Sequence, residues 1–132
     1  MNSALIYYTA HKTGYCETAL RGCTEPLGVR INRVAASVSA VNLGENINSC
    51  LAEYNVLFIV GDISRSDKAG LMSVLSCGLA KQEVKSRKIN AENSIGYLLE
   101  FDNKKLVVLP DVPEKISGLV SAVLIEYLKM EN

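Results

Sequence analysis

The chain has 132 residues, of which 48% are hydrophobic, and this is enough to build one continuous core without metals or disulfides. Its 14 Lys and Arg residues balance its 14 Asp and Glu residues, and both signs are scattered along the chain. Because no basic stripe is present, the composition argues against nucleic acid and membrane surfaces as partners. The length predicts a single domain over residues 1–132.

The first half of the chain alternates apolar strands with amphipathic helices. Residues 4–10 are short and continuously apolar, which is typical of a strand covered on both faces. A helix follows, and we expect it to end before Pro26, since proline disfavours helical geometry in the residue before it. Residues 29–37 predict a second strand. The next helix has a stripe formed by Ile47, Cys50, Leu51 and Tyr54.

The middle of the chain contains its most strand-like run, residues 56–60. This run ends in the polar loop 61–67, where Ser66 or Asp67 is available to cap a helix. The inner face of that helix would consist of Leu71, Val74, Leu75, Gly78 and Leu79.

The last third changes to paired strands. After the charged stretch 81–88, residues 94–101 and 105–109 predict two strands joined by a tight turn at Asp102-Asn103. The second strand stops at Pro110, and Asp111 and Pro113 open a final amphipathic helix.

Strands that alternate with helices predict a three-layer α/β/α sandwich, with a mostly parallel sheet plus a β-hairpin. Ligands of such sheets collect at the carboxyl ends of the strands. The loops 9–15, 61–67 and 110–113 are therefore the expected site.

The chain also carries signals of its compartment. No apolar run approaches the ~18 residues that a membrane-spanning helix needs, and residues 1–10 lack the basic start of a signal peptide. The cysteines show neither CxxC spacing nor a histidine at metal-ligand spacing. We expect a cytoplasmic protein without a metal site, whose thiols are reduced and buried. The cysteines are Cys16, Cys23, Cys50 and Cys77.

Three motifs follow one another near the end of the chain. They are Ile95-Gly96-Tyr97, the hairpin through Asp102-Asn103, and Leu109-Pro110-Asp111-Val112-Pro113 with its helix. Their order and spacing resemble the molybdopterin-binding fold of MoaB/MogA and CinA proteins, in which a Gly-Phe, a hairpin and Leu-Pro-Gly-x-Pro occur in turn. Upstream, residues 54–67 take the place of the family's strand and Thr-Gly-Gly-Thr-Gly loop, with Gly61 matching a glycine and Asp67 the later acidic residue.

This resemblance implies a small-molecule site. Family members bind molybdopterin or adenine nucleotides, and they adenylylate the pterin or hydrolyse a nucleotide pyrophosphate, so molybdopterin or a nucleotide with Mg²⁺ is the ligand it suggests. The resemblance also implies a homo-oligomer, which a near-neutral chain has little charge to resist. The candidate ligand-binding residues are Thr9, Gly61, Asp62, Ser64, Ser66, Asp67, Gly96, Pro110, Asp111 and Pro113.

The sequence departs from the family at its two signature loops. A glycine-rich loop binds phosphate because bare backbone N–H groups approach the anion. Here Gly61 is followed by Asp62, and Asp111 replaces the glycine of Leu-Pro-Gly, so two carboxylates stand where phosphate is expected. The sequence therefore predicts a binding or accessory protein with altered ligand choice.

Two further interpretations of the 61–67 loop remain open. Its Ser64, Arg65 and Ser66 side chains could replace backbone donors to an anion, or the loop could be an ordinary turn with a helix cap. An enzyme that keeps pyrophosphate chemistry, with Asp62 and Asp67 holding Mg²⁺, is the second functional hypothesis. In that hypothesis Asp111 is a further ligand.

The first loop supports a third hypothesis. Residues 7–19 resemble the phosphate loop of flavodoxins, with Thr9, Thr13 and Gly14 at matching positions, which would imply an FMN carrier. Tyr15 and Cys16 replace the Asn-Thr of that loop. His11 has a side chain suited to general base catalysis, although the sequence supplies no orienting partner for it.

Overall fold

A computed structural model describes residues 2–63, 70–79, 83–91 and 93–131. Six strands form one sheet in the order β2-β1-β3-β6-β5-β4. The first four strands in this order are parallel, whereas β5 runs antiparallel to both β6 and β4. The strands are β1 (Asn2–Tyr8), β2 (Arg30–Ser37), β3 (Val56–Gly61), β4 (Lys85–Ala91), β5 (Ser94–Phe101) and β6 (Lys104–Pro110).

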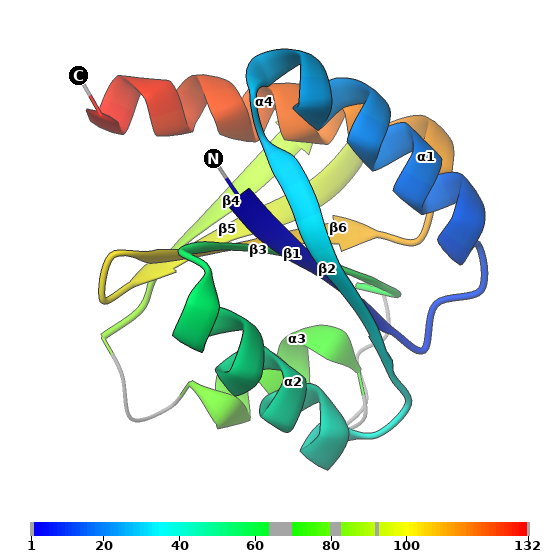
Figure 1. The fold of residues 1–132 in the computed structure, drawn as a ribbon, viewed down its shortest axis with the longest axis vertical. Coiled ribbons are helices and arrows are strands. Elements are labelled where there is room, and N and C mark those ends of the chain that lie inside the picture. The colour runs from blue at the N-terminus through cyan, green and yellow to red at the C-terminus, as the bar shows by residue number, and fades with distance from the viewer. Residues whose placement is uncertain (1, 64–69, 80–82, 92, 132) are drawn as a thin grey trace.

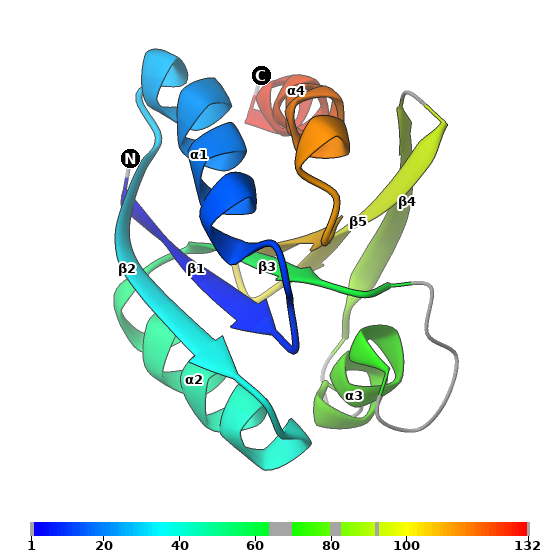
Figure 2. The same cartoon turned by 90° about the vertical axis from the view of Figure 1, so that its right-hand side faces the viewer.

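Helices cover both faces of the sheet (Figure 1). The helices α1 and α4 lie together on one face, and α2 and α3 lie on the other, as Figure 2 shows from the side. This is the three-layer α/β/α sandwich that the alternating pattern predicts. The helices are α1 (Thr13–Thr24), the short 3-10 helix η1 (Glu25–Leu27), α2 (Ala40–Glu53), α3 (Leu71–Gly78) and α4 (Pro113–Glu131).

The central strands divide the core between the two helix layers. Successive side chains of a strand point to opposite faces, so Leu5 and Tyr7 of β1 pack under α1 while Ala4 and Ile6 pack over α2. Every residue of β3 is buried, as its unbroken apolar run indicates. The parallel part of the sheet is therefore covered on both faces.

The helix and turn signals of the sequence are also confirmed. Helix α1 ends at Thr24, two residues before Pro26, and Gly28 then reverses the chain with a φ of 81°. The turn between β5 and β6 has positive φ angles at Asp102 (48°) and Asn103 (61°), the geometry that tight hairpins require.

The structure corrects two expectations. The expected hairpin has a third antiparallel strand, since β4 (Lys85–Ala91) pairs with β5. This strand begins inside the charged stretch 81–88, which the sequence does not predict to be a strand, and it ends three residues after it. Ile89 is the one residue of this edge strand that is buried. Edge strands often carry charged side chains, so this strand lacks the apolar alternation by which a strand is predicted. The first strand ends at Tyr8 and not at residue 10, because Thr9 leaves the extended conformation with a φ of 47°.

Two further findings concern membrane-spanning helices and the cysteines. None of the helices in the described part of the chain combines the length and apolar character that crossing a bilayer requires. Cys16, Cys23 and Cys50 are free, with Cys16 and Cys50 fully buried and Cys23 half-buried. The expectation of buried thiols is confirmed for Cys16 and Cys50, whereas Cys23 is only partly buried and the side chain of Cys77 lies outside the described residues.

Candidate functional site

A cavity of about 580 Å³ opens at the carboxyl ends of the parallel strands. Thr9 reaches it from the end of β1, Asp62 from the end of β3, and Pro110 with Asp111 from the end of β6. The fold thus brings four of the predicted site residues to one place. Their meeting follows from topology, since parallel strands deliver their following loops to the same edge of a sheet.

The carboxylate of Asp111 lies at the amino end of α1. Its Oδ2 accepts a hydrogen bond from the backbone N–H of His11 at 2.7 Å, and its Oδ1 accepts one from the backbone N–H of Lys12 at 3.2 Å. The thiol of Cys16 is 3.5 Å from Oδ1. Backbone donors at a helix amino terminus form a preferred anion position because the helix dipole is positive there. Asp111 fills this position from within the chain.

Helix α1 depends on this contact for its amino-terminal cap. The residue before its first turn is Lys12, whose side chain makes no capping hydrogen bond. A carboxylate from a segment about 100 residues away thus does what an adjacent Ser or Asp usually does. The contact ties the β1–α1 loop to the start of α4, so both walls of the cavity are held together.

Cys16 is inert under neutral conditions. Burial, followed by the hydrogen bond and charge of Asp111, raises the pKa of its thiol to about 12. A thiol that keeps its proton is a weak nucleophile, and the S–H of Cys16 donates a hydrogen bond to the Asp111 carboxylate beside it. Cys16 therefore supports Asp111 and does not supply a reactive thiolate.

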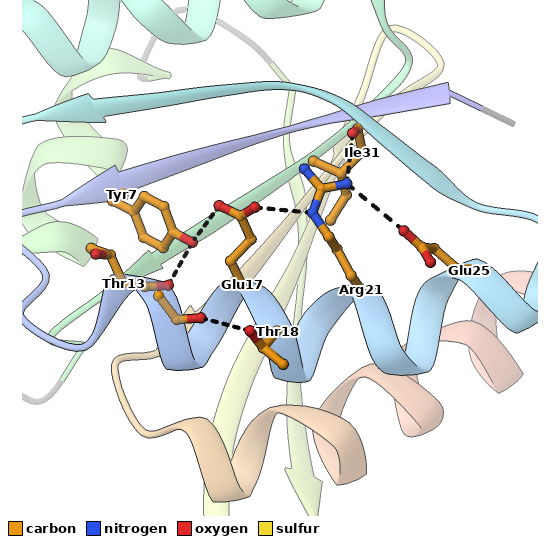
Figure 3. A network of polar contacts seen from close by, with 8 residues as sticks. Tyr7, Thr13, Glu17, Thr18, Arg21, Glu25 and Ile31 are labelled. Atoms are coloured by element: carbon orange, nitrogen blue, oxygen red, sulfur yellow. Dashed lines mark hydrogen bonds and ion pairs between the residues drawn. The ribbon is translucent and has the colours of Figure 1, made fainter.

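A polar network anchors α1 to the sheet beside the cavity (Figure 3). The hydroxyl of Tyr7 donates to the Thr13 carbonyl at 2.8 Å and lies 3.4 Å from Glu17 Oε1. Arg21 Nε forms a salt bridge with Glu17 Oε2 at 3.0 Å, and Arg21 Nη1 donates a hydrogen bond to the Ile31 carbonyl at 3.0 Å. Burial and the charge of Glu17 raise the pKa of Tyr7, so its phenol stays protonated and donating.

The loop that carries the two amide donors begins at a strained residue. Thr9 has a φ of 47°, a region that β-branched residues rarely adopt. Its backbone N–H donates to the Ser37 carbonyl at 3.0 Å, which holds the end of β1 against β2. Strain of this kind persists only where surrounding contacts fix it, and here it redirects the chain toward the cavity.

Gly61 and Gly96 are required for packing. A Cβ added at Gly61 would lie 2.9 Å from the Tyr8 carbonyl oxygen and 3.0 Å from a methyl group of Leu71. A Cβ at Gly96 would lie 2.9 Å from the Val108 carbonyl oxygen. Both glycines are buried and neither is among the described residues that line the cavity. Close approach of neighbouring elements is sufficient to explain them.

The other predicted site residues either lie in a helix or fall outside the described residues. Pro113 is the first residue of α4, where it serves helix initiation. Ser64, Ser66 and Asp67 lie outside the described residues. His11 lines the cavity and is exposed.

The described residues do not form a ready magnesium site. No group of three or more His, Cys, Asp or Glu side chains among them could hold a metal ion. Asp111, which the enzyme hypothesis includes as a ligand, directs its oxygens at backbone amides. The chain therefore offers no described cluster for the Mg²⁺ that the family resemblance implies.

Sequence reasoning did not identify the fourth wall of the cavity. Asn93, Ser94 and Tyr97 line it from the turn between β4 and β5 and from β5 itself. Because the charged stretch 81–88 has no apolar alternation, its pattern does not predict a strand, and this turn has no place in the predicted sheet. The polar Asn93-Ser94 pair before an apolar run is the signal that could have marked it.

The topology also bears on the flavodoxin resemblance of the first loop. Flavodoxins place their strands in the order 2-1-3-4-5. This sheet shares the first three positions and then continues with β6, β5 and β4, with β5 antiparallel to its neighbours. The likeness of residues 7–19 is therefore local, and the fold around it differs.

Comparison with known proteins identifies the fold. Neither a protein-family model nor a curated protein sequence matches this chain. Among solved structures, the crystal structure of the CinA protein with unknown function from Thermoplasma acidophilum has a TM-score of 0.76. The match covers 95% of this chain and 96% of that one, with 12% sequence identity. The chain has a CinA-like α/β fold, and at this identity the likeness extends to the fold alone.

Proposed function

We propose that this chain is a binding or accessory protein of the CinA and MoaB/MogA type, with a ligand choice altered at the amino end of α1. The observation that carries the proposal is the pair of hydrogen bonds from the His11 and Lys12 amides to Asp111. The ligand would occupy the cavity at the carboxyl ends of β1, β3 and β6. A phosphate group would be excluded from the amide donors.

The exclusion follows from charge and from hydrogen bonding. A phosphate that approached these amides would have to displace a carboxylate that already holds them. Asp111 would then lose its two donors while it stood beside a second anion, and Asp62 adds another carboxylate to the same cavity. A heterocycle without phosphate, such as a nucleoside or a plain pterin, meets none of this repulsion. Tyr97 and Thr9 offer an aromatic ring and a hydroxyl to such a ligand.

Calorimetry with adenosine and ATP, each with and without Mg²⁺, tests the proposal. The native protein should bind adenosine more tightly than ATP. Asp111→Ala removes the internal anion and exposes two amide donors, so the affinity for ATP should rise roughly tenfold, as expected for charge-assisted hydrogen bonds. Asp111→Asn keeps an acceptor and should give a smaller gain.

Glu114→Gln is the matched control for this experiment. Glu114 is exposed in the first turn of α4 and has the same charge as Asp111, and it is not among the described side chains that accept from these amides. Its substitution should leave the preference between adenosine and ATP unchanged. Tight ATP binding by the native protein, or an equal gain in the Glu114→Gln variant, would contradict the proposal.

Self-association is a second part of the proposal. Val38 and Val41 are 84% and 74% exposed just beyond the edge strand β2, where a second copy of the chain would cover them. Light scattering at micromolar concentration should give a mass above that of the monomer. Replacing both valines with serine should lower the mass toward that of the monomer, and a native monomer would contradict this part of the proposal.

A further inference from the structure

Strand β2 leaves one side of the sheet open. It is the outermost strand next to β1, and no other strand in the described ranges pairs with it (Figure 2). An edge strand of this kind presents backbone N–H and C=O groups that another strand can bind. The opposite edge strand, β4, carries the cations Lys85, Arg87 and Lys88, which hinder such pairing, whereas residues 34–37 of β2 carry no charge. The β2 edge is therefore the less protected of the two.

The ladder with β1 shows which backbone groups of β2 face outward. The backbone N–H of Thr9 donates to the Ser37 carbonyl. The N–H and C=O of one residue point to the same side of a strand, and successive residues alternate between the two sides. Ser37 and Ala35 therefore direct these groups toward β1. Val34 and Ala36 direct theirs away from the sheet.

The side chains along this edge are apolar and exposed. Val34 and Ala36 lie on the face of the sheet where α1 covers the neighbouring residues of β1. Val34 is nevertheless 41% exposed, and Ala36 is exposed as well. Five large hydrophobic side chains are exposed in the described part of the chain, and three of them belong to β2 or to the segment that follows it, namely Val34, Val38 and Val41. This concentration at one edge indicates a surface that a partner covers.

We propose that the partner is β2 of a second copy, so that two copies of the chain form one continuous sheet about a twofold axis. Two identical strands that a twofold axis relates within one sheet run antiparallel, and such a pair is closed and does not continue into a fibre. The proposal rests on the self-association part of the function proposed above and specifies its interface.

Charge and overlap select how the two strands align. The regular part of β2, residues 33–37, begins at Arg33 because the register with β1 shifts just before it. Outward-facing groups of the two copies meet only if the axis passes through a residue. An axis at Arg33 would place two arginines opposite each other, which destabilises a strand pair. An axis at Val34 or Ala36 would align only three of the five regular residues, whereas an axis at Ala35 aligns all five.

The alignment about Ala35 satisfies the outward-facing groups. Val34 lies opposite Ala36 of the partner subunit, and each such pair exchanges both of its backbone hydrogen bonds. The Val34 side chain packs against an alanine methyl group, so exposed apolar surface is removed from water. Arg33 lies opposite an uncharged serine, Ser37 of the partner subunit.

Disulfide cross-linking tests this alignment. Ala35→Cys brings two thiols together at the axis, with Cα atoms about 4.5 Å apart, which is within the range of a disulfide. Under mild oxidation this variant should form a covalent dimer. Val34→Cys is the matched control, because its two thiols are displaced by two residues along the strands and their Cα atoms are about 8 Å apart. It should cross-link no more than the native protein, which contains the same other cysteines.

Charge exchange tests the alignment without a covalent bond. Val34→Lys and Ala36→Glu each place a charge against an apolar partner, so each should raise the dissociation constant of the dimer roughly tenfold. The double variant Val34→Lys/Ala36→Glu places opposite charges across both pairs and should return to within roughly threefold of the native value. The matched control is Val34→Lys/Ala36→Lys, which should not recover. Light scattering over a concentration series measures association, and circular dichroism verifies the fold.

The outcomes separate this proposal from the one on which it rests. A native monomer would overturn both this proposal and the self-association part of the proposed function. A native oligomer whose folded Ala35→Cys variant does not cross-link, or whose Val34→Lys/Ala36→Glu variant does not recover, would overturn the β2 pairing and leave self-association standing. If Ala35→Cys does not fold, the charge variants decide.

Discussion

The two edges of the parallel sheet differ in what they present to a ligand. At the carboxyl edge, loops turn into helices and expose backbone amides, and the chain covers two of these amides with Asp111. At the amino edge, where the parallel strands begin, α4 covers the strand starts and leaves an apolar space. A shared fold therefore does not determine which ligand is bound. A single acidic side chain can occupy the helix amino terminus at which a parallel sheet most readily binds an anion.

The largest expected effect tests whether Gly61, the last residue of β3 at the carboxyl edge, is required for packing. Gly61→Ala places a Cβ 2.9 Å from the Tyr8 carbonyl oxygen, so β1 or α3 must shift. We expect the free energy of unfolding, measured by urea denaturation, to fall by about 2–3 kcal/mol. The control is Gly44→Ala in α2, where an added Cβ would have no atom of another element within 4 Å. There the same change should stabilise the protein by about 0.5–1 kcal/mol.

An unchanged stability in Gly61→Ala would mean that the close approach does not constrain this position. Gly61 would then have to be explained by contact with a ligand, as the family resemblance first implied. The packing interpretation of the carboxyl edge would be wrong at that residue.

The next effect measures what the internal anion contributes to stability. Asp111→Ala removes two acceptor contacts, at 2.7 Å and 3.2 Å, from amides at the start of α1. Because the site is partly exposed, we expect a loss of about 1–2 kcal/mol in the free energy of unfolding. Glu114→Gln should change it by less than about 0.5 kcal/mol. If Asp111→Ala is as stable as the native protein, Asp111 does not cap α1.

A smaller effect concerns the network that positions α1 beside this edge. Tyr7→Phe keeps the buried ring and removes the hydroxyl that donates to the Thr13 carbonyl. The free energy of unfolding should fall by about 1 kcal/mol. Tyr15→Phe is the matched control, since Tyr15 is 75% exposed, and its stability should be that of the native protein. Equal stabilities of the two variants would show that the network is dispensable.

The sequence predicts the fold better than it predicts the site, and the two edges show why. Apolar periodicity identifies β3 and α4 because the spacing of apolar residues is a property of each segment alone. The charged strand β4 has one fully buried residue and is defined by its pairing with β5, which no local pattern records. The same holds for Asp111, whose carboxylate was expected to repel a ligand from its own loop. Its contact with amides about 100 residues earlier exists only in the folded chain.

The last and smallest effect appears only at alkaline pH, where the buried thiol beside the carboxyl edge begins to ionise. Burial and Asp111 raise the pKa of Cys16 from 9.0 to about 12, so the native state holds this proton more tightly than the unfolded chain does. The resulting stability is fully present below about pH 9 and is lost as the pH rises toward 12. Burial raises the pKa values of Cys23, Cys50 and Tyr7 as well, which adds to the loss in the same direction. Urea denaturation at stepped pH should therefore show a falling free energy of unfolding above pH 9, with a smaller fall in Cys16→Ala than in the native protein. If the two proteins lose stability equally over this range, Cys16 ionises as readily in the native state as in the unfolded one, and Asp111 does not act on its thiol.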